Sequence, residues 1–252
     1  MSQEAPAAHF ERVSDVEAES PTLIEGLPGL GMVASIAVDQ ITSQLDLDYH
    51  GNIQSDALPP LAAFDEGRIR DAVRVYAGRE PSVMTLQSDI PIPPNAIQSL
   101  SECVYRDLAD EFDRAIFLVG AQAESEDQIG AVSGVAASDE MESALIDAGI
   151  SLAEESGAIG GVTGGLVVDG YHNDIPAAVL IVRCDPRLPD PSAARAVIEN
   201  ALEPLVEFDI DTNELEEQAE KIRKQKQQIA RQLQQMQQQQ EGEPIQTRTM
   251  FQ

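Results

Sequence analysis

The feature that most constrains the fold is an alternation of short apolar runs with segments of helical periodicity. In the first unit, residues 22–25 form a predicted strand, a glycine-rich loop follows, and residues 32–45 repeat apolar side chains at helical spacing. Further strand candidates are residues 72–76, 83–86, 114–123, 131–138 and 177–182, and further helix candidates are residues 97–112, 139–148, 162–171 and 190–208. Because the apolar runs are mostly continuous, the sheet should be buried on both faces between helices. The sequence therefore predicts an α/β fold, a three-layer α/β/α sandwich over residues 21–208.

The loop of the first unit contains Gly26, Pro28, Gly29 and Gly31. A glycine loop before a helix can cradle phosphate, but the dinucleotide-binding order is G-x-G-x-x-G, whereas the order here is G-x-x-G-x-G with no lysine nearby. We therefore interpret the loop as a structural turn that lets the strand and the helix pack closely. Phosphate binding stays the alternative.

The composition changes after residue 208. Residues 211–241 are rich in helix formers, and Leu215, Ile222, Ile229 and Met236 recur every seven residues, with Leu233 on the interleaved position. This heptad seam predicts a long coiled-coil helix through which copies of the chain associate as a homo-oligomer. Gly242 and Pro244 should end it, leaving residues 242–252 as a flexible tail. At the other end, the polar residues 1–20 are expected to be disordered.

The chain carries a formal net charge of −28. Residues 1–210 hold 37 acidic residues and 10 arginines with no lysine, whereas residues 211–252 hold 7 acidic and 6 basic residues. Such a field repels nucleic acid and anionic lipid, so neither nucleic acid nor membrane is predicted as a partner. A carboxylate coat without lysine suggests a cytoplasm of high salt, where screening removes most self-repulsion.

The sequence contains no recognisable catalytic or metal-binding constellation. The three histidines are scattered, and Cys103 and Cys184 are predicted to be reduced thiols packed in the core. We therefore expect no catalytic residue, no metal, no cofactor and no enzymatic activity. The N-terminal residues lack the basic and apolar regions of a secretory signal, and no apolar run reaches membrane-spanning length, so a cytoplasmic location is expected.

Two stretches of the sequence resemble a known protein family. Residues 23–41, LIEGLPGLGMVASIAVDQI, resemble the opening strand–loop–helix of the archaeal and bacterial proteasome assembly chaperone family (proteasome assembly chaperone 2-like), with matches at Gly26, Pro28, Gly29, Gly31 and Ala34. Residues 160–182 resemble the second glycine-rich helix and the strand after it. The resemblance implies a fold similar to nucleoside phosphorylases, homo-oligomers and binding of 20S proteasome α-subunits by some archaeal members. The acidic coat makes a haloarchaeal member the expectation.

The same resemblance implies a function for the final residues, Met250, Phe251 and Gln252. Proteasome activators and some assembly factors end in a hydrophobic–tyrosine–any-residue tripeptide that inserts between neighbouring α-subunits, and here phenylalanine replaces the tyrosine. The leading hypothesis is a non-enzymatic assembly chaperone or adaptor that docks on the α-ring through this tail. The alternatives are a small-molecule hydrolase or transferase that uses the Gly26–Gly31 loop, and an oligomeric scaffold with an inert tail.

Overall fold

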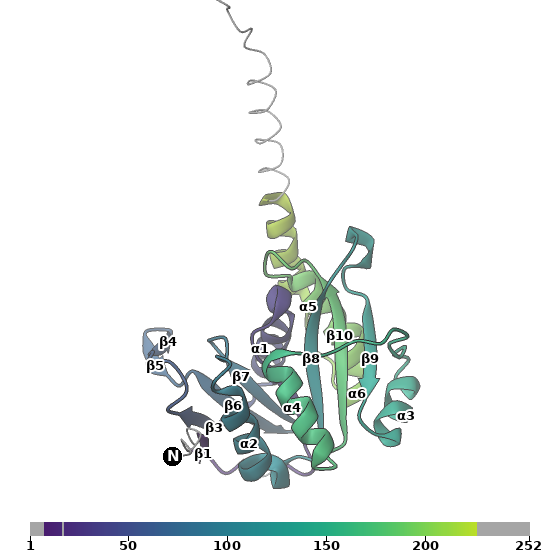
Figure 1. The fold of residues 1–252 in the computed structure, drawn as a ribbon. Coiled ribbons are helices and arrows are strands. Elements are labelled where there is room, and N and C mark those ends of the chain that lie inside the picture. The colour runs from purple at the N-terminus through teal and green to yellow at the C-terminus, as the bar shows by residue number, and fades with distance from the viewer. Residues whose placement is uncertain (1–7, 17, 226–252) are drawn as a thin grey trace, which may run out of the picture.

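The computed structural model describes residues 8–16 and 18–225 (Figure 1). Its centre is an eight-stranded mixed sheet in which β7, β2, β8 and β10 run parallel, while the remaining neighbours pair antiparallel. In sheet order the strands are β1 (Ala8–Arg12), β3 (Asp48–Ser55), β6 (Val73–Arg79), β7 (Ser82–Ser88), β2 (Thr22–Gly26), β8 (Arg114–Gln122), β10 (Ala177–Cys184) and β9 (Val132–Ala136). A separate hairpin is formed by β4 (Ala63–Asp65) and β5 (Arg68–Arg70).

Helices cover both faces of the sheet (Figure 1). One face carries α1 (Val33–Gln44), α3 (Asp139–Asp147), α5 (Pro191–Val197), a π-helical turn at Ile198–Leu202 and α6 (Glu203–Val206). The other face carries α2 (Ile97–Cys103), a π-helical turn at Val104–Leu108 and α4 (Gly161–His172). Short 3₁₀ turns lie at Leu30–Met32, Ala109–Glu111 and Glu126–Gln128. The architecture is an α/β sandwich of three layers, as the alternation of apolar runs predicted.

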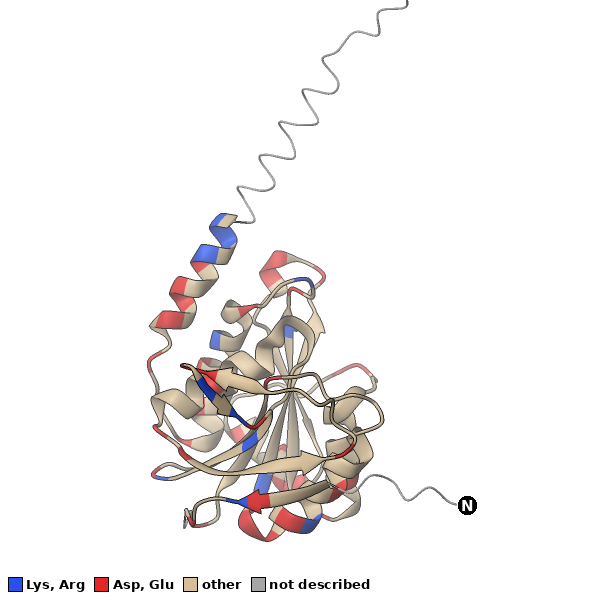
Figure 2. Cartoon of the chain, turned by 90° about the vertical axis from the view of Figure 1, so that its left-hand side faces the viewer, with Lys and Arg blue, Asp and Glu red and all other residues tan. Residues whose placement is uncertain are grey.

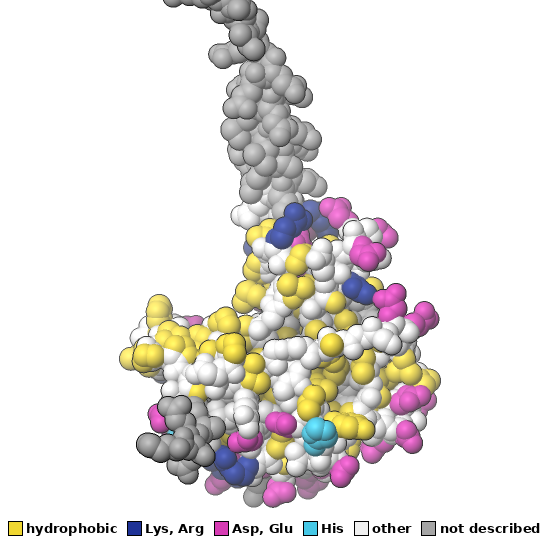
Figure 3. All heavy atoms as spheres, viewed as in Figure 1, with side chains coloured by type: hydrophobic (Ala, Val, Ile, Leu, Met, Phe, Trp, Pro, Cys, Tyr) yellow, Lys and Arg dark blue, Asp and Glu magenta, His cyan; other side chains and the backbone are white. Residues whose placement is uncertain are grey.

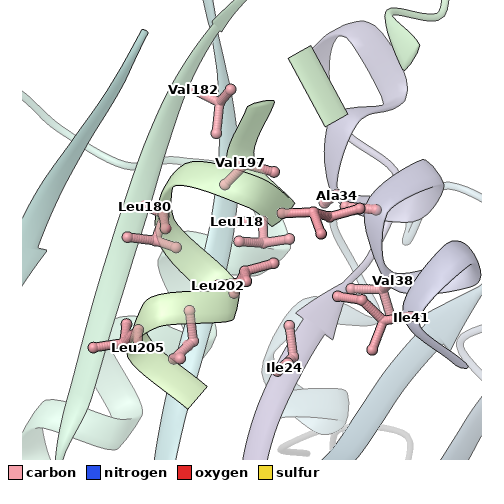
Figure 4. Packing of buried hydrophobic residues seen from close by; sticks show 14 of the residues in the cluster. Ile24, Ala34, Val38, Ile41, Leu118, Leu180, Val182, Val197, Leu202 and Leu205 are labelled. Carbon is pink, nitrogen blue, oxygen red and sulfur yellow. The ribbon is translucent and has the colours of Figure 1, made fainter. Parts of the chain in front are cut away.

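Alternate residues of the parallel strands enter two separate cores. Ile116 and Leu118 of β8 face the α1 and α5 side, whereas Ala115 and Phe117 face the α2 and α4 side, because successive side chains of a strand point to opposite faces. Figure 4 shows the first core, in which side chains of α1 and of the α5 segment converge on the sheet. This double burial explains the continuous apolar runs in the sequence.

The antiparallel part of the sheet was only partly predicted. The expectation of disorder is wrong for residues 8–12, because they form the edge strand β1, which pairs with β3 from Ala8 opposite Ser55 to Arg12 opposite Gly51. Backbone hydrogen bonding to a neighbouring strand orders this polar segment, and Ala8 and Phe10 add packing against the sheet. Residues 1–7 and 17 lie outside the described residues. Strand β3 and the β4–β5 hairpin were not predicted.

The segment predicted as one amphipathic helix over residues 97–112 is interrupted. Helix α2 ends at Cys103 and continues as a π-helical turn and then a 3₁₀ turn. The predicted apolar positions are buried nonetheless, since Leu100, Val104 and Leu108 are almost inaccessible to solvent. Within residues 8–16 and 18–225, no helix combines the length and hydrophobicity needed to cross a bilayer.

Candidate functional site

The first candidate site is the start of the C-terminal helix, which is helical from residue 213 to residue 225 and projects from one end of the domain (Figures 1 and 2). Polar contacts hold the base of this helix against the domain. Thr212 donates a hydrogen bond to Glu199. The Arg195 guanidinium lies 3.2 Å from the Glu216 carboxylate and 2.7 Å from the Glu199 carboxylate. Gln40 of α1 also donates to the Asp211 carbonyl at 2.9 Å. The helix therefore leaves the domain from a fixed base, called here the helix root (Thr212, Leu215, Glu216, Arg195 and Glu199).

Ionisation of Glu199 strengthens the contacts of the helix root. Partial burial opposes ionisation, but hydrogen bonds from Thr212 and Arg195 outweigh it and lower the pKa of Glu199 below its usual value. An ionised Glu199 thus accepts bonds from both the domain and the helix. Sequence reasoning missed this cluster because its members belong to α5, the π-helical turn and the connection after α6.

Only the first two of the predicted coiled-coil residues, Leu215 and Ile222, lie within the described part of the chain. Leu215 is only 2% exposed and lies in the core beside α5 and α6, so this first seam position packs inside its own domain. Ile222 is half-buried and, with Ala219, lines a groove against the loops after β8 and β10. Ile229, Leu233 and Met236 lie outside the described residues, as do Met250, Phe251 and Gln252. The coiled coil and the terminal tripeptide stay predictions.

The glycine loop connects β2 to α1 at the carboxyl edge of the parallel strands. A Cβ on Gly26 would lie 2.4 Å from the Val38 Cβ of α1, and one on Gly31, whose φ is +64°, would lie 2.7 Å from the Cys184 Sγ of β10. Two of the glycines therefore allow a close approach of neighbouring elements. Gly29 differs, because a Cβ there would meet nothing within 4 Å.

A cavity of about 790 Å³ opens beside Gly29, within the size range of small-molecule sites. It lies where the strands β2 and β7 end, which is where α/β sheets commonly bind ligands. Its wall combines the glycine loop, Arg70, Arg74, Asp39, Asp89 and the loop of Pro186–Pro189.

Most of the polar groups of this cavity are bonded to other protein groups. Arg74, only 3% exposed, contacts Asp89 at 2.5 Å and donates to the Asp71 carbonyl at 2.6 Å. Arg70 forms a second bidentate contact with Asp89, at 3.0 and 2.9 Å. Burial opposes ionisation of Asp89, but the hydrogen bonds and positive charges of these arginines lower its pKa. The arrangement fixes the cavity wall and leaves few free polar groups to face a ligand.

Asp39 and Arg187 are the cavity's less engaged charged residues. Desolvation raises the pKa of Asp39 above its usual value, with Arg70 and Arg74 opposing that rise. The Arg187 side chain is 84% exposed and lies 3.4 Å from Asp185. Among the residues that the structure describes, no group of three or more histidine, cysteine, aspartate or glutamate side chains is placed to hold a metal ion.

A buried carboxyl group lies at the carboxyl end of β2, on the face opposite α1. Glu25 is inaccessible to solvent; one carboxyl oxygen accepts hydrogen bonds from the Leu27 amide at 3.1 Å and from the Thr163 hydroxyl of α4 at 3.2 Å, and the other has no partner. Desolvation raises the pKa of Glu25 to about 8, against the lowering effect of these bonds. The signal in the sequence was a lone acid within the apolar run of residues 22–25.

These features define a class of protein: a layered α/β domain with a cavity at the carboxyl edge of its parallel strands and a C-terminal helix that projects from one end of the domain. The chain belongs to the PAC2 family, whose model matches residues 23–230. The family match spans both glycine-rich stretches and the helix root.

The chain is also similar to individual proteins and solved structures. The uncharacterized protein MJ0106 of Methanocaldococcus jannaschii is 28% identical over 215 residues, covering 84% of this chain and 87% of that protein. Among solved structures, PbaA of Pyrococcus furiosus, described as an archaeal homolog of proteasome-assembly chaperone, is 25% identical with a TM-score of 0.77, covering 91% of this chain and 99% of PbaA. PbaB of the same organism, described as an archaeal proteasome activator, shares the fold at 18% identity and a TM-score of 0.78, covering 89% and 99%.

Proposed function

We propose that this protein is a non-enzymatic, homo-oligomeric proteasome assembly chaperone or adaptor, and that Met250, Phe251 and Gln252 dock on the 20S α-ring. The observation that carries the proposal is the likeness to PbaA over nearly the whole of both chains. The helix root supports it, because the described part of the helix, residues 213–225, points away from the domain (Figure 1).

The physical basis is a small apolar plug. Burying the Met250 and Phe251 side chains in a cleft would contribute roughly 1.5–3 kcal/mol each, before the cost of ordering the tail. The terminal carboxylate would meet a basic group of the cleft. A single tail therefore binds weakly, and several tails on one oligomer bind tightly through avidity.

The test is a pull-down with purified proteasome α-subunits in multimolar salt. Deletion of residues 250–252 and Phe251→Ser should abolish association, whereas the nearby control Thr247→Ala should leave it unchanged. Phe251→Tyr should bind at least as well as the unchanged protein, because it restores a hydroxyl that can donate a hydrogen bond. Undiminished association of the deletion variant would refute the docking role of the tail.

The heptad seam is proposed to join copies of the chain beyond the root. Ile229→Asp and Leu233→Asp place a charge on the seam, and the molar mass measured by light scattering should fall. Exchanging Gln235 for aspartate, a position off the seam, is the matched control. An unchanged mass in the seam variants would remove the coiled coil from the proposal.

We also propose that the protein works in high salt, on the basis of the acidic coat and the absence of lysine from residues 1–210. Dilution from multimolar to about 0.1 M salt should unfold the domain as carboxylate repulsion becomes unscreened. Circular dichroism during the dilution measures this, and a domain that stays folded would contradict it.

A second candidate function, a small-molecule hydrolase or transferase, has the cavity beside Gly29 in its favour. Gly29 is extended, with φ −143° and ψ −162°, and a Cβ there meets no atom within 4 Å, so a side chain can be attached without backbone strain. Gly29→Phe should fill the cavity. If this variant keeps full proteasome association, the cavity has no part in docking; if it abolishes turnover of a small-molecule substrate, the enzyme function is favoured.

A further inference from the structure

Exposed apolar side chains gather at two separate places on the domain. Six of the eleven large hydrophobic residues that are exposed in the described chain lie there. Leu61, Phe64 and Ile69 belong to the β4–β5 hairpin and its approach, and are called the hairpin knob; they are 50%, 77% and 82% exposed. Leu30, Met32 and Leu188 line the cavity beside Gly29, and are called the cavity rim; they are 39%, 44% and 43% exposed.

The hairpin knob faces away from the domain. Phe64 and Ile69 are cross-strand partners, so their side chains share one face of the hairpin, and this face points to solvent. The neighbouring pair, Ala63 and Arg70, lies on the other face, where Arg70 reaches Asp89 in the cavity wall. The hairpin is therefore anchored to its own domain on one side and presents an unpartnered apolar pair on the other. Figure 3 shows apolar side chains gathered over this hairpin at the left edge of the view.

The tight turn holds the hairpin knob in a defined shape. Glu66 and Gly67 both have positive φ, +46° and +78°, as the type I′ turn of a two-residue hairpin requires. The Glu66 side chain projects from the tip and is exposed. The knob is thus convex, apolar on its outer face and acidic at its tip.

The cavity rim has the opposite shape and charge. It surrounds a hollow of about 790 Å³, in whose lining Arg70 and Arg74 are paired with Asp89, so Arg187 is the exposed basic side chain. Arg187 stands at the rim with its side chain 84% exposed. The exposed guanidinium of Arg187 can therefore face an acidic side chain of another molecule.

We propose that the hairpin knob of one copy of this chain seats in the cavity rim of a second copy, with Glu66 opposite Arg187. Convex and concave shape, apolar facing surfaces and opposite charges all occur on the same chain, which makes a second copy the matching occupant. Because the two surfaces are different patches, the contact is head-to-tail, the kind that forms rings when the rotation closes. It is separate from the heptad seam and does not rest on docking to the proteasome.

Cross-linking tests the contact directly. One tagged chain carries Phe64→Cys and a second, differently tagged chain carries Leu188→Cys; the native Cys103 and Cys184 are inaccessible to solvent and stay silent. Mild oxidation of the mixture should join the two tags. A product that joins two Phe64→Cys chains instead, or no joined product, would overturn the proposal.

Charge reversal tests the pairing of Glu66 with Arg187. In moderate salt, Glu66→Arg and Arg187→Glu should each weaken self-association several-fold by sedimentation, and the double variant should recover it. Glu140→Arg, an exposed acid on α3, is the control for the change in net charge. Absence of recovery in the double variant would contradict the proposed pairing.

Removal of the apolar contact tests the same interface in high salt, where charge is screened. The combination of Phe64→Ser and Ile69→Ser should lower the molar mass, whereas Ile146→Ser with Val168→Ser, at exposed positions on α3 and α4, should not. An unchanged mass in the hairpin variant would overturn the proposal, whatever the outcome of the tail deletion.

Discussion

The parallel and antiparallel halves of the sheet differ in which helices and loops surround them. Strands β7, β2, β8 and β10 are covered by helices on both faces, and their carboxyl edge carries the glycine loop and the cavity. Strands β1, β3 and β6 form one flank of the sheet, and the small hairpin β4–β5 comes from the connection between β3 and β6. We therefore expect substitutions in the parallel half to cost more stability than substitutions in the exposed β4–β5 hairpin.

The largest expected effect comes from a matched pair of glycines. Gly26→Ala places a methyl group 2.4 Å from the Val38 Cβ, which is fixed to the α1 backbone, so the free energy of unfolding should fall by about 3 kcal/mol. Gly67→Ala in the hairpin turn meets no atom and should cost about 1 kcal/mol through its positive φ alone. Chemical denaturation at constant high salt measures both. Equal losses would contradict the difference between the two halves.

The buried Glu25 should make the parallel half sensitive to pH. Its pKa of about 8 in the folded protein exceeds the usual 4.5, so folding takes up a proton between these values and stability falls as pH rises across this window. Glu25→Gln removes the titration. The difference in unfolding free energy, variant minus unchanged protein, should grow by roughly 3 kcal/mol from pH 5 to pH 8.

The control for Glu25 is Glu140→Gln at an exposed site of α3, which should show no comparable growth. Denaturation curves recorded at several pH values measure the unfolding free energies of both variants and of the unchanged protein. A flat difference between Glu25→Gln and the unchanged protein would mean that the buried carboxyl does not titrate as its surroundings indicate.

The helix root should respond to pH in the opposite direction. Because the pKa of Glu199 is lowered in the folded protein, its contribution is present above the usual value of 4.5 and is lost as pH falls through the folded pKa. Glu199→Gln should loosen the root at neutral pH by about 1 kcal/mol. Hydrogen exchange of the amides in residues 213–225 would be faster, whereas Glu217→Gln, exposed on the same helix, should leave it unchanged.

The smallest expected effect belongs to the hairpin knob. Phe64→Ser with Ile69→Ser removes side chains that are 77% and 82% exposed, so the unfolding free energy of the monomer should change by less than about 0.5 kcal/mol. Thermal unfolding at a protein concentration low enough to dissociate any oligomer measures this. A loss of several kcal/mol would place these residues in the fold of the domain and not on a partner-facing surface.

The difference between the parallel and antiparallel halves of the sheet also explains which elements could be predicted from the sequence. The runs around β2, β8 and β10 are continuously apolar because both faces are buried, and α3 and α4 lie within a residue or so of the predicted ranges. Strand β3, with the sequence DYHGNIQS, gives no such signal, because two of its buried residues, His50 and Asn52, are polar. Strand β1 is polar enough to resemble a disordered segment, and it is ordered by pairing with β3, a strand about 40 residues away in the sequence.

The sequence by itself determined the layered α/β class, the glycine loop between β2 and α1, and the family, because these depend on local periodicity and on short motifs. The tertiary structure alone decided that Leu215 packs into its own domain, that Glu199, Arg195 and Thr212 meet at the helix root, and that Arg70 and Arg74 share Asp89. It also decided that the hairpin knob is left without a partner within the described chain. The physical reason is that burial patterns repeat along the chain and can be counted there, whereas contacts between distant segments depend on how the layers are assembled.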